Sequence, residues 1–241
     1  MEPTRETVRP LLELQRIDSS VDRLNGRAAA LPEQQEMDRL TEELAAARKT
    51  LAERELGFGG LSRDTAKLEA EVEALSDKIK HENDRLYSGS VGSPKELTAI
   101  QAEIDGLRKR KNHVEDQLLE LMEKKEAAEK DFNESKEQVS GLESQVAAAT
   151  VARDTATTDI AGEIEKLQDE RRALLPSIPE EAVEVYEQVR PKKEGVAVAA
   201  YEHGVCRGCM VELSPVARDE IKRSDDPFPR CENCRRILIV L

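Results

Sequence analysis

The sequence predicts a mainly α-helical protein, in which a long antiparallel coiled-coil hairpin is followed by a small C-terminal β domain that binds a metal. Three observations predict this fold class. Charged residues make up 36% of the 241 residues and aromatic residues only 2%, a composition typical of long helices and poor in the side chains that fill globular cores. Apolar residues recur with a 3.5-residue period over most of the chain. All four cysteines lie in the last 36 residues.

Charge divides the chain into two electrostatically different parts. Residues 1–195 contain 30 Lys and Arg against 43 Asp and Glu, whereas residues 196–241 contain seven of each. The acidic excess disfavours non-specific binding of nucleic acid by the longer part. The N-terminal MEPTRETVRP has no apolar core, and the terminal ILIVL is far too short to span a bilayer. We therefore expect a cytoplasmic protein without a signal peptide or membrane segment.

The first helical arm, at roughly residues 4–86, shows its apolar repeat in pieces. The phase of the repeat slips near Pro32, and because proline cannot donate a helical hydrogen bond, it ends or kinks a helix there. The glycine-rich residues 57–60 are a second weak point, since each glycine costs about 1 kcal/mol relative to alanine in a helix. We expect bends at these places and helix elsewhere.

The turn between the arms is predicted near residues 87–94, within RLYSGSVGSPKEL. Gly89 and Gly92 permit positive φ angles. Ser93 suits the N-cap of the next helix, with Pro94 at its first position and a glutamate two residues further on completing a capping box. The segment has more polar groups than a bend requires, so its tip is also a candidate contact site, formed by Tyr87, Ser88, Ser90 and Lys95.

The second helical arm, roughly residues 97–175, has the clearer repeat. From Leu97, steps of three and four residues reach mostly apolar positions for about eleven heptads, which predicts a left-handed coiled coil. Lys111, Lys125 and Arg171 interrupt this seam, where they either tune the register or extend towards water. Because the two arms are nearly equal, we expect an antiparallel pair with Leu86 near Leu97 and Ile17 near residue 166.

The hairpin is predicted to end with residue 175. Prolines and two early glutamates in LLPSIPEEAVEVYEQVRP indicate a short connecting helix within residues 176–195. Residues 196–241 form the predicted β domain, because GVAVAAYEHGV reads as a strand leading into the first cysteines. MVEL reads as a second strand, Ser214-Pro215 as the start of a short helix, and RRILIVL as the last strand.

The cysteines form two pairs, Cys206-Arg-Gly-Cys209 and Cys231-Glu-Asn-Cys234, separated by 21 residues. Two such turns present four sulfurs to one tetrahedral ion, which is the pattern of a structural zinc site with no open position for catalysis. The sequence therefore predicts a zinc ribbon with one structural Zn²⁺. Its core is small, so metal binding is expected to supply most of its folding free energy.

Other interpretations of the cysteines stay open at this point. Disulfides need an oxidising compartment, a redox pair needs only one C-x-x-C in a βαβ context, and an iron–sulfur cluster also uses four cysteines. His203, three residues before Cys206, is an alternative ligand. His81 and His113 fall on the predicted helices and are expected to be solvated.

Taken together, three segments carry a resemblance: YSGSVGSPKELTAIQAEI at the turn, IPEEAVEVYEQVR in the connecting helix, and GVAVAAYEHGVCRGC with RCENCRRIL around the cysteines. The chain resembles the bacterial C4-type zinc-ribbon/coiled-coil family over nearly its whole length. The resemblance implies that Cys206, Cys209, Cys231 and Cys234 are the metal ligands, and that the protein is a non-enzymatic adaptor or chaperone that contacts transcription components or RNA. Many ribbon knuckles have glycine after the second cysteine, where this chain has Met210 and Arg235.

Basic residues near the cysteines are candidates for contact with nucleic acid or a partner protein. The set comprises Arg207, Phe228, Arg230, Arg235 and Arg236, with Phe228 available to stack on an unpaired base. Asp225, Asp226 and Glu232 lie beside them, and a four-thiolate zinc site carries a charge of about −2. The competing interpretation is that the arginines offset these charges and that Phe228 packs in the small core.

Two function classes follow from the sequence, and a third is disfavoured. The first is a non-catalytic adaptor, whose coiled coil binds a protein and whose zinc ribbon contacts nucleic acid or a protein of the transcription or RNA machinery. The second is a structural spacer or scaffold that binds no nucleic acid. The sequence has no phosphate loop, catalytic triad or paired carboxylates in a pocket-forming context, so we expect no enzymatic activity, small-molecule substrate or membrane contact.

Overall fold

The computed structural model describes residues 2–89 and 91–241, and these divide into two compact units. One unit consists of the described residues up to Gln35 together with Thr150–Leu241, and the other of the described residues between Glu36 and Ala149. The helices in chain order are α1 (Leu11–Ala29), α2 (Pro32–Tyr87), α3 (Pro94–Leu174), α4 (Glu180–Val189) and α5 (Pro215–Arg223). The strands are β1 (Val198–Glu202), β2 (Val205–Cys206), β3 (Val211–Glu212) and β4 (Ile237–Val240). The protein is therefore mainly helical with a small C-terminal sheet, as predicted.

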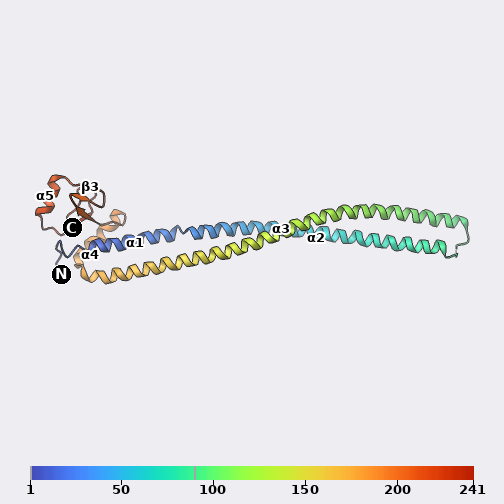
Figure 1. Cartoon of the computed structure of the whole chain (residues 1–241), viewed down its shortest axis with the longest axis horizontal. Helices are drawn as coiled ribbons and strands as arrows, with labels where there is room; N and C mark the ends of the chain where they lie inside the picture. The colour runs from blue at the N-terminus through green and yellow to red at the C-terminus, as the bar shows by residue number, and fades with distance from the viewer. Residues whose placement is uncertain (1, 90) are drawn as a thin grey trace. The chain divides into compact units, whose positions relative to one another are not determined.

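The Glu36–Ala149 unit is an antiparallel pair formed by α2 and α3 (Figure 1). Buried apolar side chains from both helices line the seam: Leu40, Leu44 and Leu75 from α2, and Ile100, Ile104, Val114 and Val139 from α3. Ion pairs cross between the helices outside the seam, such as Arg48 to Glu143 at 2.7 Å and Arg110 to Glu71 at 2.7 Å. This arrangement confirms the predicted helical hairpin.

The glycine-rich residues 57–60 lie inside α2, whose helical assignment continues through them. The Phe58 ring stacks on that of Phe132 in α3, with a centroid distance of 5.8 Å and an interplanar angle of 8°. One turn away, Arg54 donates hydrogen bonds to the Asp131 carbonyl and to the Ser135 hydroxyl at 2.7 and 2.6 Å. These cross-helix contacts stabilise a helix that the glycines alone would weaken.

The turn between α2 and α3 begins after Tyr87. Gly89 has φ of 73°, as expected for a residue that leaves a helix, whereas Gly92 does not adopt a positive φ. The next helix begins at Pro94, and the Ser93 carbonyl accepts its first helical hydrogen bond, from the Leu97 N–H at 3.1 Å. The predicted places of Ser93 and Pro94 at the start of α3 are therefore correct.

In the other unit, α1 packs against the last part of α3. The helix breaks at Ala30 and Leu31, directly before the proline that starts α2, as predicted. Leu24, Leu31 and Ile160 form a buried cluster between these helices. Below it, Ile17 lies beside Ala173 and Leu174 rather than beside residue 166. The pairing is already shifted inside α2, where Phe58 stacks on Phe132, so the offset from the expected register arises between the turn and Phe58.

A larger core lies where α1, α4 and the sheet meet. Its buried apolar residues are Val8, Leu11, Leu14, Ile178, Ala182, Tyr186, Val189, Ala197, Val198, Ile237 and Ile239. The members come from the N-terminal segment, both helices and the two central strands. The connecting helix α4 is flanked by short 3₁₀ turns at Leu175–Ser177 and Arg190–Lys193 and is amphipathic, with Ala182 and Tyr186 facing this core.

The sheet has the strand order β3-β2-β1-β4, with β1 parallel to β4 and the other pairs antiparallel. The single strand predicted before the cysteines is instead a hairpin, because His203 and Gly204 have φ of 52° and 86° and reverse the chain between β1 and β2. Two positive φ angles in succession are the requirement of a tight hairpin turn, and His–Gly satisfies it. None of the described helices contains an apolar stretch of the length that a membrane span requires.

Candidate metal centre and its surroundings

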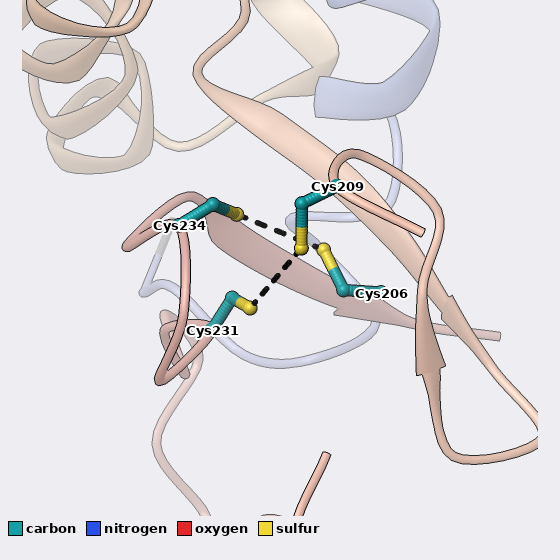
Figure 2. A group of neighbouring side chains, drawn as sticks. All are labelled: Cys206, Cys209, Cys231 and Cys234. Carbon is teal, nitrogen blue, oxygen red and sulfur yellow. Dashed lines mark hydrogen bonds between the residues drawn. The ribbon is translucent and has the colours of Figure 1, made fainter. Parts of the chain in front are cut away.

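The four cysteines converge on one point in the C-terminal region (Figure 2). Their sulfur atoms all lie within 4.8 Å of one another, and the Cys206–Cys234 and Cys209–Cys231 Sγ distances are both 3.8 Å. Sulfurs at the corners of a tetrahedron around zinc, each about 2.3 Å from the metal, are separated by about 3.8 Å. A disulfide requires about 2.05 Å, so the four cysteines are free thiols.

Two similar turns hold the sulfurs in place. In the first, which starts at the end of β2, the Met210 N–H donates to the Cys206 carbonyl at 2.8 Å. In the second, the Arg235 N–H donates to the Cys231 carbonyl at 2.9 Å. Gly208 in the first turn has no room for a side chain, since an added Cβ would lie 2.8 Å from the Ala199 Cβ. The C-x-x-C spacing alone therefore does not build the site, and the glycine is also required.

Met210 and Arg235 occupy the left-handed backbone region, with φ of 60° and 63°. This region costs an ordinary residue about 1–2 kcal/mol but costs glycine nothing. The knuckles thus keep the conformation that glycine favours, although neither residue is glycine. Both side chains are exposed.

The environments of the thiols differ. Burial raises the pKa of Cys206 to about 12 and also raises the pKa of Cys231. For Cys209 burial acts in the same direction, but hydrogen bonds from the Asn233 side chain and the Val211 backbone outweigh it and lower the pKa to about 7. Cys209 is therefore the first of these three thiols to ionise, and zinc must displace protons from the buried pair.

The cluster fits one structural Zn²⁺. All four ligands are thiols, two of their separations equal the edge of a zinc tetrahedron and all are within 4.8 Å, and Cys206 and Cys231 are fully buried. His203 is exposed and is not part of the cluster. When bound, the metal would link the β2 knuckle to the segment before β4.

Residues 14–194 match the CT398-like coiled coil hairpin domain, and residues 205–238 match the C4-type zinc ribbon domain. The chain belongs to the CT398-like coiled-coil hairpin family. An uncharacterized protein of Mycobacterium tuberculosis is 27% identical to it over 97% of this chain and 95% of the relative. A solved structure from Mycobacterium smegmatis covers all of both chains with a TM-score of 0.79 and 27% identity.

The structure of CT398 from Chlamydia trachomatis shares the fold with this chain. It has a TM-score of 0.62 and 24% identity, and 98% of each chain is covered. The resemblance noted in the sequence is thus confirmed for both parts, the coiled-coil hairpin and the zinc ribbon. The M. tuberculosis relative is described only as uncharacterized, so it assigns no biochemical role to the family's zinc ribbon.

The candidate arginines near the family's zinc site are not equivalent. Arg207 is paired with Glu202 at 2.9 Å, and the half-buried Arg236 donates to the Val196 carbonyl at 3.0 Å. Arg230 and Arg235 are exposed, and Arg230 donates to the Arg235 carbonyl at 3.4 Å. Two of the four guanidinium groups are thus engaged within the fold, and the other two face solvent.

Phe228 is half-buried and packs against the core shared by α1, α4 and the sheet. Its placement corresponds to the competing interpretation from the sequence, in which it fills the small core. Glu232 accepts hydrogen bonds from the Ser214 N–H at 2.6 Å and from the Ser214 hydroxyl at 3.0 Å. The second knuckle is thereby tied to the start of α5, where the Ser214 hydroxyl also accepts the Ala217 N–H.

The tip residues lie in the other unit, far from the zinc site in sequence. Tyr87 is 82% exposed, and Ser88 and Lys95 are exposed as well. Ser90 lies outside the described residues. Tyr87 borders a shallow apolar depression with Leu86 and Leu97, the two residues expected to meet at the turn. The tip therefore displays an aromatic side chain beside an apolar surface.

A buried polar network below the ribbon was not predicted. Asp18 of α1 is 3% exposed and accepts hydrogen bonds from Arg171 Nε and the Tyr186 hydroxyl, both at 2.8 Å. Gln15, one turn away, accepts the Ala197 N–H at 2.6 Å and donates to the Gly195 carbonyl at 2.7 Å. The only available signal was the polar Arg171 on an apolar seam, which we assigned to register or to solvent.

Proposed function

We propose that this protein is a non-catalytic zinc-binding adaptor. The coiled-coil hairpin binds one protein, and the zinc ribbon contacts nucleic acid or a protein of the transcription or RNA machinery. The observation that carries the proposal is the closed metal centre. Four thiols occupy every position of the tetrahedron, so the metal has no position for a substrate or a reactive water and serves to hold a surface in shape.

The features available for contact support an adaptor with two separate binding regions. In the hairpin, the tip presents the exposed Tyr87 beside an apolar depression. In the ribbon, Arg230, Arg235 and Met210 are exposed around the two knuckles. Exposed aromatic, methionine and arginine side chains are typical of protein-binding surfaces. The exposed side chains of both regions are therefore explained by contact with a partner, without a catalytic role.

The proposal is tested by chemical crosslinking of the full-length, zinc-loaded protein in its native extract, followed by affinity capture and mass spectrometry. We expect crosslinks from two separate regions, one near the tip and one near the knuckles. Cys231→Ser should abolish the ribbon crosslinks and leave those of the hairpin, whereas Tyr87→Ala should reduce only the hairpin crosslinks. If neither region retains a partner above the level of an unrelated coiled coil, the protein is a spacer and the adaptor proposal is wrong.

A mobility-shift assay addresses the nucleic-acid contact separately. The two exposed arginines provide few phosphate contacts, so any binding should be weak and should decrease steeply between 50 and 200 mM salt, by roughly tenfold for two contacts. No shift at the lowest salt concentration would restrict the ribbon's partner to protein.

A further inference from the structure

A groove of about 400 Å³ lies in the ribbon between α5 and the second knuckle, and the zinc ligands do not line it. Its apolar part is formed by Ala217 and Ile221 of α5 together with Phe228. Val216, at the first turn of α5, is 77% exposed at its edge. Apolar surface of this kind, beside a rigid knuckle, can accept an aliphatic side chain from another molecule.

Some of the charged residues at the groove have hydrogen-bond partners within the fold, whereas the arginines have no ion-pair partner among the residues that the structure describes. Both oxygens of Glu232 accept hydrogen bonds from Ser214, and Asp226 Oδ1 accepts the Phe228 N–H at 2.8 Å. Arg230 and Arg235, by contrast, are exposed and form no ion pair within the described part of the chain. All three acids that line the groove, Glu220, Asp226 and Glu232, are exposed. The groove therefore offers guanidinium donors whose natural complement is a carboxylate or phosphate.

Arg235 also has a strained backbone, with φ of 63° at a position where glycine would be free of strain. Among the described residues no side-chain hydrogen bond or ion pair of Arg235 is seen, and Arg235 lines the groove. Met210 has nearly the same φ at the equivalent position of the first knuckle and does not line the groove, so what marks Arg235 is its place in the groove without an ion pair.

A protein partner fits this surface better than nucleic acid. The aromatic side chains described in this unit, Tyr186, Tyr201 and Phe228, are buried or half-buried, so none provides the exposed platform on which unpaired bases stack. Only two arginines line the groove, which is too few to neutralise the several successive phosphates of a nucleic-acid backbone. The exposed Met210 and Val216 favour an apolar protein surface instead.

We propose that this groove binds a segment of a partner protein that presents an aliphatic side chain next to an aspartate or glutamate. The aliphatic group packs on Val216 and Ala217, and the carboxylate binds Arg235 and Arg230. This inference specifies the ribbon contact of the adaptor function proposed above and rests on it. Binding at the hairpin tip is independent of the groove.

The test uses the zinc-loaded, full-length protein and a random library of 12-residue peptides displayed on phage. We expect the recovered peptides to combine Leu, Ile, Val or Met with Asp or Glu at neighbouring positions. Measured by fluorescence anisotropy, their affinity should fall at least about tenfold with Arg235→Gly, because a charge-assisted hydrogen bond is lost. Val216→Asp should weaken binding to a similar degree.

Arg235→Gly also separates a binding role from a structural one. It removes the backbone strain, so zinc content and thermal stability should be unchanged or higher while peptide binding is lost. Arg223→Ala is the matched control, since Arg223 is an 84% exposed arginine of α5, is paired with Asp219 at 3.7 Å and does not line the groove. It should alter the affinity less than about twofold.

Three results would overturn the proposal: no enriched peptides, peptides that are insensitive to both groove substitutions, or a labelled oligouridylate of 12 nucleotides that binds and is lost with Arg235→Gly. The last result would assign the groove to nucleic acid. None of them affects the crosslinks expected at the hairpin tip, so failure of this inference is distinguishable from failure of the adaptor function.

Discussion

Replacing Asp18 with alanine tests whether the buried polar network holds the base of the ribbon to the helices. Asp18 accepts hydrogen bonds from Arg171 Nε and the Tyr186 hydroxyl. Its carboxylate lies 3.8 Å from Arg190 Nε, a buried atom without a hydrogen-bond partner among the described residues. The Asp18 carboxylate of α1 is thus a partner for three groups: the Arg171 guanidinium of α3, the Tyr186 hydroxyl of α4 and the Arg190 guanidinium of the 3₁₀ turn that follows.

The expected loss follows from what the substitution leaves behind. The Tyr186 hydroxyl would be buried without a partner, at a cost of about 1–3 kcal/mol. Arg171 and Arg190 keep Glu187 and Asp22 as partners and are about a quarter exposed, at 26% and 23%, so their contribution is smaller. Removing one partner from a buried ion pair typically costs about 3–5 kcal/mol. We therefore expect Asp18→Ala to lower the free energy of unfolding by about 3–4 kcal/mol.

The assay is thermal unfolding of the zinc-loaded chain followed by circular dichroism. At about 2–4 °C per kcal/mol for a chain of this size, the midpoint should fall by roughly 10 °C. Tyr186→Phe should lower the free energy of unfolding by only about 1–1.5 kcal/mol. In a double-mutant cycle, the losses from Tyr186→Phe and Asp18→Ala should not be additive, because the two residues share a hydrogen bond. Asp169→Ala, which removes an exposed helical ion pair with Arg172, is the control and should not change the midpoint. An Asp18→Ala midpoint within 3 °C of the wild type would refute the reasoning.

Four further predictions concern the same unit. Burial and the hydrogen bond to Asp18 raise the pKa of Tyr186. The stabilisation that the protonated Tyr186 provides is therefore complete below pH 10, the ordinary tyrosine pKa, and is lost progressively as the pH rises above it. Tyr186→Phe should flatten the alkaline part of a curve of stability against pH. Zinc must displace protons from Cys206 and Cys231, whose pKa values are raised by burial, so the apparent affinity measured by competition with a chelator should fall at least ~100-fold from pH 7 to pH 6. Met210→Gly relieves a positive φ and should stabilise the knuckle by about 0.5–1 kcal/mol, seen as slower zinc loss to a chelator; faster loss would contradict the strain. Arg5 donates to the Ile221 and Ser224 carbonyls at the end of α5, so Arg5→Lys should speed hydrogen exchange in that helix and leave exchange in α2 unchanged.

The helices and the metal ligands were predictable because their signals are local and periodic. A heptad repeat requires apolar residues at fixed intervals, and two C-x-x-C turns place four sulfurs whatever lies between them. Pro32 and Pro94 acted as expected because proline restricts the backbone independently of tertiary context. The turn between β1 and β2 was missed, since His203 adopts a positive φ that glycine or asparagine would have signalled more clearly.

The polar network could not be predicted, because its members are distant in sequence and each has an ordinary local interpretation. Polar residues such as Gln15 and Asp18, and a tyrosine such as Tyr186, are ordinary in amphipathic helices, so none of the three stands out in the sequence. Only the packing of α1 between the end of α3 and the sheet brings them together. Likewise, the pairing of Arg207 with Glu202 and of Arg236 with a carbonyl distinguishes them from Arg230 and Arg235, although all four look alike in sequence.

The structure also changes the expected role of zinc in folding. The sequence suggested that the metal supplies most of the ribbon's folding free energy, because the ribbon's own core is small. Yet one face of the sheet packs on helices: Val198, Ile237 and Ile239 join the core formed with α1 and α4. Gln15 also holds the backbone at the start of β1. Only the other cluster, with Leu213 and Ile221, contains the cysteines.

Zinc removal should therefore act on one half of the ribbon. A chelator is expected to loosen the knuckles and α5, whose packing depends on Cys206 and Cys231, while β1 and β4 stay attached to the helices through their apolar face. The groove between α5 and the second knuckle belongs to the half that depends on metal. Hydrogen exchange with and without zinc would show protection lost in α5 and retained in β1 and β4. Equal loss in both would mean that the helices do not support the sheet and that the metal organises the whole ribbon.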